Sequence, residues 1–146
     1  MTAVLLFGAV TVSSAVEVSF LYWGDRHSRN LPFYEVVDGV KTEVGGVGAL
    51  AGMVNTLRSE DPNTLVLVAG GEFGGAPISI LTSGESQVRL LNRIRIDCLT
   101  PGDHEFDYGW RSLREVTGKA KFPVLAANVV NTETNAPLFT SDTVFA

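Results

Sequence analysis

Apolar residues along the chain fall into two kinds of run, compact runs typical of buried strands and spaced runs typical of helices. The run that ends at Gly24 is rich in β-branched and aromatic residues, and the run before Gly70 is apolar without alternation. Both patterns favour strands, the second one covered on both faces. We expect strands over 16–25, 64–71, 96–102 and 122–130, helices over 44–62, 78–94 and 110–120, and a polar loop over 26–43.

This alternation of strands and helices, joined by glycine-rich turns, predicts an α/β fold with a mostly parallel sheet. Polar clusters follow the first three strands, and ligands of such sheets collect beyond the carboxyl ends of the strands. The three clusters read GDRHS, GGEFGG and GDHEFDYG. Their convergence predicts a functional site at one edge of the sheet.

Composition narrows the class of partner. The 146 residues carry a formal net charge of −5 and show no basic stripe, so we expect no nucleic-acid partner. The single cysteine, Cys98, lies in an apolar run and is interpreted as a buried thiol, because one cysteine cannot form an internal disulfide. Residues 1–15 are apolar and then small, which predicts a signal peptide and no membrane span, with periplasmic or extracellular export.

Asp25 and His27 lie two residues apart after the first strand. On an extended backbone their side chains would point to the same side and could bind one cation. A carboxylate oxygen with an imidazole nitrogen suits Zn, Mn or Fe. By itself the pair also fits a solvated loop, and only its position at a strand end favours a site.

His104 and Asp107 lie three residues apart in the third cluster. Asp107 is close enough to accept a hydrogen bond from one ring nitrogen and so fix the tautomer. The other nitrogen could then donate a proton to a leaving oxygen or stabilise charge on a phosphate. We expect Glu105, between them, to be solvated or to cap a helix.

The order of four blocks is more specific than any one of them. GDRHSR, DPNTLVLVAGGEFGG, IDCLTPGDHEFDYG and KFPVLAANV together resemble the amino-terminal half of the metallophosphoesterase domain of 5′-nucleotidases, over about residues 16–130. The same superfamily includes cyclic phosphodiesterases and thiosulfohydrolases. The resemblance implies part of a four-layer α-β-β-α sandwich over residues 16–146, and a site with two divalent metals that activate water to attack phosphorus.

Carried over by position, the resemblance implies a role for each site residue. Asp25 and His27 would bind the first metal, and His104 with Asp107 would form a catalytic dyad beside the scissile phosphate. Phe106 and Gly109 would shape the loop.

Two positions depart from the family pattern. Gly71 stands where the family has the carboxylate that bridges the metals, and Asp103 stands where it has an asparagine ligand. Asp103 is therefore assigned as a metal ligand that restores the lost charge, and the site is expected to hold two metals, one or none. Glu72 could replace the bridge only if its glycine-rich loop rearranged.

Three functions remain open from sequence. The first is a metal-dependent phosphoester hydrolase of the 5′-nucleotidase type, acting on a small phosphoester such as a nucleotide. Its remaining metal ligands and its carboxy-terminal domain would lie beyond Ala146, so the isolated chain would be weak or inactive. The second is a non-catalytic relative, in which Gly71→Asp with Asp103→Asn should gain metal binding. The third is a thiosulfohydrolase-like member. Trp23 is interpreted as a packing residue, and Arg26 and Arg29 as solvated.

Overall fold

The computed structural model describes residues 17–145, so the segment predicted as a signal peptide lies outside the described residues. A three-stranded parallel sheet forms its centre, in the order β1–β4–β5. These strands comprise β1 (Ser19–Trp23), β4 (Thr64–Val68) and β5 (Cys98–Leu99). The fold is α/β with parallel strands, as the alternation of strands and helices predicts.

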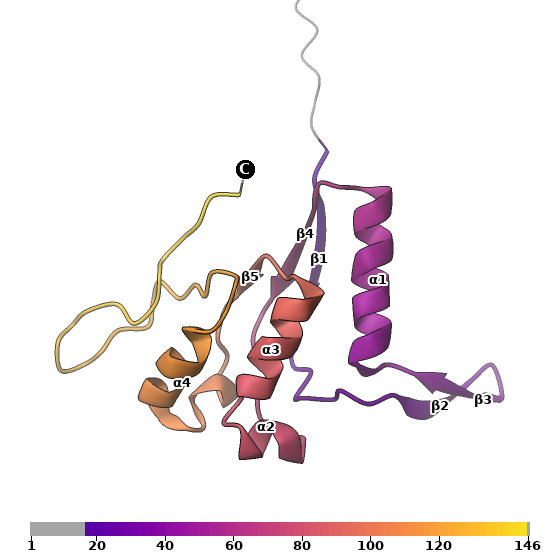
Figure 1. Ribbon diagram of the computed structural model, residues 1–146, viewed down its shortest axis with the longest axis horizontal. Helices are drawn as coiled ribbons and strands as arrows, with labels where there is room; N and C mark the ends of the chain where they lie inside the picture. The colour runs from indigo at the N-terminus through magenta and orange to yellow at the C-terminus, as the bar shows by residue number, and fades with distance from the viewer. Residues whose placement is uncertain (1–16, 146) are drawn as a thin grey trace, which may run out of the picture.

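Helices pack against one face of this sheet (Figure 1). They are α1 (Gly46–Glu60), α3 (Glu85–Ile94) and α4 (Gly109–Thr117). The short α2 (Pro77–Leu81) packs against α3, and a 3-10 helix η1 (His104–Phe106) precedes α4. The core between helices and sheet is built from Val54 of α1, Val66 of β4, Leu91 of α3 and Leu113 of α4, all at most 1% exposed.

The two faces of β1 differ. Leu21 and Trp23 pack against the core, whereas Phe20 and Tyr22 on the other face are 62% and 76% exposed. Side chains of a strand alternate between faces, so one face is covered by helices and the other is open in the described part of the chain. The described residues thus form one helical layer and one sheet layer.

The polar loop expected over 26–43 is wrong in its second half. Residues 33–44 form an antiparallel hairpin of β2 (Phe33–Val37) and β3 (Val40–Val44), which extends away from the sheet (Figure 1). Asp38 and Gly39 at its tip have φ of 52° and 79°, the positive values that a two-residue type I′ turn requires. The Asp-Gly pair between β-branched runs is a local hairpin signal, and it overrides the interpretation of this segment as a loop.

Two other predicted elements also need correction. The helix expected over 78–94 is broken into α2 and α3, because Ser83 and Gly84 take left-handed φ values of 48° and 87°. The strand expected over 122–130 is reduced to isolated bridges, of which Val124 pairs in parallel with Leu99. Pro123 in this segment has no N–H to donate to a ladder, so only its carbonyl pairs, accepting from the Leu99 N–H at 3.1 Å.

Cys98 is 7% exposed, which confirms the predicted buried thiol. Burial raises the pKa of this thiol, and the neighbouring Asp97 charge raises it further. No helix among residues 17–145 combines the length and the apolar character needed to cross a bilayer.

Candidate functional site

The three polar clusters meet beyond the carboxyl ends of β1, β4 and β5, as predicted. Backbone hydrogen bonds join the first cluster to the second: the Asp25 N–H donates to the Gly70 carbonyl at 3.0 Å and the His27 N–H to the Gly71 carbonyl at 2.7 Å. A Cβ built at Gly74 would lie 3.6 Å from His104 Nδ1 and 3.7 Å from Asp107 Oδ2. The glycine-rich loop, residues 70–75, therefore lies between the loops that carry the two histidines.

The two histidines face each other across this junction. Their ring centroids are 4.8 Å apart and the ring planes meet at 82°. His27 Nε2 lies 3.9 Å from Asp25 Oδ1. Asp25 and His27 are thus brought together, but not by the extended backbone that the sequence analysis assumed. Both take left-handed φ values, 54° and 47°, so the chain turns sharply through them.

The hydrogen bond predicted between Asp107 and His104 is present, with 2.9 Å between His104 Nδ1 and Asp107 Oδ2. This bond, aided by the charges of Asp107, Asp103 and Glu105, raises the pKa of His104 against a smaller lowering by desolvation. The His104 ring is therefore held by one nitrogen and biased toward its protonated form. Its side chain and that of Asp107 are 41% and 44% exposed, so a ligand can reach both.

Glu72 is fully buried, and Trp23 and Arg26 hold its carboxylate. Its carboxylate accepts from Trp23 Nε1 at 2.8 Å and from Arg26 Nε at 3.0 Å, and Arg26 Nη2 also pairs with it. Arg26 further donates to Gln87 Oε1 at 3.1 Å and to Asn30 Oδ1 at 2.6 Å. The interpretation of Arg26 as solvated is therefore wrong, because its guanidinium neutralises an interior carboxylate.

Glu105 is also buried, at 1% exposure, so the expectation of a solvated or helix-capping carboxylate is wrong. Its two oxygens accept four backbone N–H groups, from Gly71, Glu72, Phe73 and Gly102. Glycine-rich loops with successive N–H groups form concavities that bind anions, and here the anion is a side chain of the same molecule.

Gly71 occupies a position that admits no side chain in this backbone. Its φ is 66°, and a Cβ there would lie 2.5 Å from Asp25 Oδ1 and 2.7 Å from Asp25 Cα. The space that the resemblance assigns to a bridging carboxylate is filled by Asp25. Glu72 cannot take that role either, because Trp23 and Arg26 hold its carboxylate.

Within residues 17–145, no three side chains of His, Cys, Asp or Glu come together closely enough to share one ion. His27 approaches both Asp25 and His104, and exposed Asp103 lies beside His104 in sequence. By themselves, these side chains do not fit a complete metal centre.

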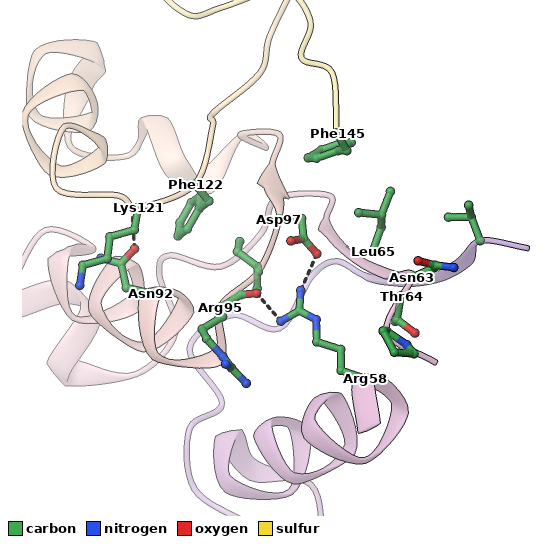
Figure 2. Close-up of a pocket in the computed structure, with 13 residues that line it drawn as sticks. Arg58, Asn63, Thr64, Leu65, Asn92, Arg95, Asp97, Lys121, Phe122 and Phe145 are labelled. Atoms are coloured by element: carbon green, nitrogen blue, oxygen red, sulfur yellow. Dashed lines mark hydrogen bonds and ion pairs between the residues drawn. The ribbon is translucent and has the colours of Figure 1, made fainter. Parts of the chain in front are cut away.

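A cleft of about 970 Å³ opens beside Asp25 and His27, and Phe33, Leu50 and Met53 contribute to its wall. A separate hollow of about 730 Å³ lies where the strands begin (Figure 2). There Arg58 donates to Asp97 Oδ2 at 2.5 Å and to the Arg95 carbonyl at 2.6 Å. Only the first of these two cavities adjoins the histidines.

Comparison with known proteins gives a consistent result. The chain is 37% identical over 118 residues to a protein of Treponema pallidum named "Probable 5′-nucleotidase", a match covering 78% of this chain and 20% of that protein. Among solved structures, the NAD nucleotidase of Haemophilus influenzae superposes with a TM-score of 0.76 at 31% identity, over 86% of this chain and 23% of that one. The calcineurin-like phosphoesterase YfkN of Bacillus subtilis gives 0.69 at 27% identity, over 84% and 40%.

No family model matches the chain. The chain spans about a fifth of the curated relative and of the nucleotidase structure named above. Calcineurin-like phosphoesterases generally use divalent metals. Identity above 30% over most of this chain, together with the superposed fold, supports the family inferred from the four sequence blocks. The chain belongs to the 5′-nucleotidase family of calcineurin-like metallophosphoesterases, of which it matches the amino-terminal part.

Proposed function

We propose that this chain supplies part of the hydrolytic site of a 5′-nucleotidase-type enzyme, which releases phosphate from a small phosphoester such as a nucleotide. The observation that carries the proposal is the His104–Asp107 pair, hydrogen-bonded at 2.9 Å and facing His27 at the carboxyl edge of the sheet. The relatives named for nucleotide hydrolysis support this class of substrate.

In this proposal His104 and Asp107 are the catalytic residues. Asp107 accepts the hydrogen bond from Nδ1–H, so the proton that His104 can give is on Nε2. As the oxygen of a water molecule bonds to phosphorus and the ester P–O bond breaks, Nε2 transfers its proton to the leaving oxygen, and His104 becomes neutral while keeping its Nδ1–H. The proton that the water loses passes to solvent, from which Nε2 is protonated again. Asp107 stays ionised throughout and holds the ring in one orientation.

Asp25, His27 and Asp103 are proposed as donors toward a divalent metal, Zn, Mn or Fe. The donor types fit such an ion, but the described residues do not complete its shell. When bound, the metal would supply a Lewis acid at the phosphoryl oxygens. With Asp25 filling the space above Gly71, the ligand set is proposed to differ from that of the family.

We also propose that the protein is exported to the periplasm or the extracellular space, on the pattern of residues 1–15. Amino-terminal sequencing of the mature protein tests this. An amino terminus near residue 16 is expected, and retention of residues 1–15 would contradict export by cleavage.

The hydrolase proposal is tested with adenosine 5′-monophosphate and the 146-residue chain, comparing added Mn²⁺ with added chelator. We expect weak, Mn²⁺-dependent release of inorganic phosphate. The variant His104→Ala should lose about 10²–10⁴-fold of that rate, because general acid catalysis contributes this much. Arg111→Ala on α4, whose guanidinium lies 4.4 Å from the Trp110 ring centroid, is the control that should keep the rate.

Nucleotide binding is measured on the same samples through the ring signals of His27 and His104 in NMR spectra. Binding without phosphate release would favour the non-catalytic relative. The proposal fails if the chain neither releases phosphate nor binds the nucleotide, or if His104→Ala leaves the rate unchanged.

A further inference from the structure

Glu105 is placed so that one carboxylate contacts two of the loops of the site. Its Oε2 accepts from the Gly71 N–H at 2.9 Å and from the Gly102 N–H at 2.6 Å, and its Oε1 accepts from Glu72 at 2.7 Å and Phe73 at 3.0 Å. Gly102 precedes η1, while the other three belong to the glycine-rich loop. The Glu105 carboxylate therefore joins the glycine-rich loop to the loop that precedes η1.

Gly71 extends this connection to the third loop. Its N–H donates to Glu105, and its carbonyl accepts from the His27 N–H at 2.7 Å. Glu105 itself follows His104 directly in sequence. Two hydrogen bonds through Gly71 therefore connect the backbone of His27 to the side chain of Glu105, the residue that follows His104.

Burial gives this connection its strength. Glu105 is 1% exposed and Phe73 is fully buried, so water cannot replace the four N–H donors without opening the core. Hydrogen bonds to an ionised acceptor are about twice as strong as neutral ones. By contrast, side-chain contact between the two rings at 4.8 Å is exposed to solvent and cannot by itself fix their separation.

We propose that Glu105 is a positioning residue, whose carboxylate holds the glycine-rich loop against the η1 loop and thereby sets the distance between the His27 and His104 rings. The importance of that distance for hydrolysis rests on the proposed function. The distance itself can be measured without turnover, so a failure of hydrolysis and a failure of this proposal are separate results.

The variant Glu105→Gln replaces one of the two carboxylate oxygens with an amide nitrogen. An amide keeps one acceptor, so two N–H donors retain their partner, while the amide NH₂ faces the other two donors and repels them. With the amide oxygen at the Oε1 position, the Gly71 and Gly102 N–H groups lose their acceptor and Glu72 and Phe73 keep theirs. A flipped amide gives the reverse pair. Either way, two of the four amides should exchange with solvent at least about tenfold faster.

The experiment is NMR on the 146-residue chain, reading amide exchange and the nuclear Overhauser contacts between the His27 and His104 rings. The wild-type chain should show ring-to-ring contacts and four slowly exchanging amides. Glu105→Gln should lose or weaken the ring contacts. Glu85→Gln is the matched control, because it removes a carboxylate bound to Lys119 Nζ at 2.7 Å on the surface and should change neither reading.

The proposal is overturned if Glu105→Gln frees two amides but leaves the ring contacts as in the wild type, since Glu105 would then only stabilise the loop. It is also overturned if all four amides keep their protection. Should Glu105→Gln fail to fold, Glu105→Asp gives the second test. It keeps the charge but draws the carboxylate back by one carbon, and is expected to weaken the ring contacts in a folded chain, with unchanged contacts contradicting the proposal.

Discussion

Two kinds of carboxylate lie in and around the site: buried ones that bind protein groups, and exposed ones that meet solvent. Glu72 and Glu105 are buried and fully engaged, one by an arginine and an indole, the other by four backbone N–H groups. Asp25 and Asp107 are exposed, at 88% and 44% of their side chains. A buried charge must be matched by its surroundings, whereas an exposed one is matched by water.

This difference in burial implies different roles for the two pairs of carboxylates. The buried pair determines where the loops lie, and the exposed pair is left free to meet a ligand. Removing a contact of a buried carboxylate should therefore cause the largest change in the free energy of unfolding. Removing a contact of an exposed carboxylate should change the pKa of its partner, with little effect on the free energy of unfolding.

The largest effect is expected from Arg26→Met. The substitution leaves Glu72 buried with a charge whose one remaining side-chain donor among the described residues is Trp23 Nε1. Loss of one partner of a buried ion pair costs about 3–5 kcal/mol. Urea unfolding should show this loss in the free energy of unfolding. Arg89→Met is the control, since Arg89 pairs with Glu85 at 3.3 Å on the surface and its loss should cost less than about 1 kcal/mol. Equal losses of unfolding free energy in the two variants would contradict the distinction between buried and exposed carboxylates.

A smaller effect is expected from Gly71→Ala. The left-handed φ of Gly71 and the 2.5 Å approach of a Cβ to Asp25 Oδ1 together predict a loss of about 1–3 kcal/mol in the free energy of unfolding. The control is Gly52→Ala in α1, where a Cβ meets nothing within 4 Å, and a gain of about 1 kcal/mol is expected.

The same geometry bears on the Gly71→Asp, Asp103→Asn variant that the sequence alone predicts to gain metal binding. Its new side chain must first displace Asp25. Calorimetric titration with Mn²⁺ measures the outcome, and a gain in affinity without loss of stability would show that the loop opens readily.

The sequence predicted the parts of this fold and site that depend on local pattern. The strand before Gly24 and the helix before Pro62 follow from apolar spacing, and the His104–Asp107 bond follows from a separation of three residues. Convergence of the three clusters follows from the rule that the carboxyl ends of parallel strands meet at one edge.

Features that depend on contacts between distant segments could not be predicted from the sequence. Glu72 contacts Arg26 across 46 residues, and Glu105 contacts Gly71 across 34. Nothing in their neighbours distinguishes these two carboxylates from solvated ones, because burial is decided by the packing of helices that lie elsewhere in the chain. The hairpin tip at Asp38 and Gly39 is different, since its signal was local and readable.

The smallest effect is expected at the exposed His104–Asp107 pair and is a change in how the stability of the fold depends on pH. The hydrogen bond from Asp107 raises the pKa of His104 above its ordinary value of 6.5. Because the pKa of His104 is higher in the folded state than in the unfolded state, protonation of His104 stabilises the fold. This stabilisation is complete below about pH 6.5 and is lost as the pH rises through the higher pKa of the folded state. Asp107→Asn removes the carboxylate, so the pKa of His104 should fall toward its ordinary value and that pH dependence should shrink. NMR titration of the His104 ring gives the pKa, and urea midpoints at about pH 5.5 and about pH 8.5 give the stability. Because both side chains are exposed, the midpoint should move far less than in Arg26→Met, and an equally large shift would mean that the surface pair also holds the loops.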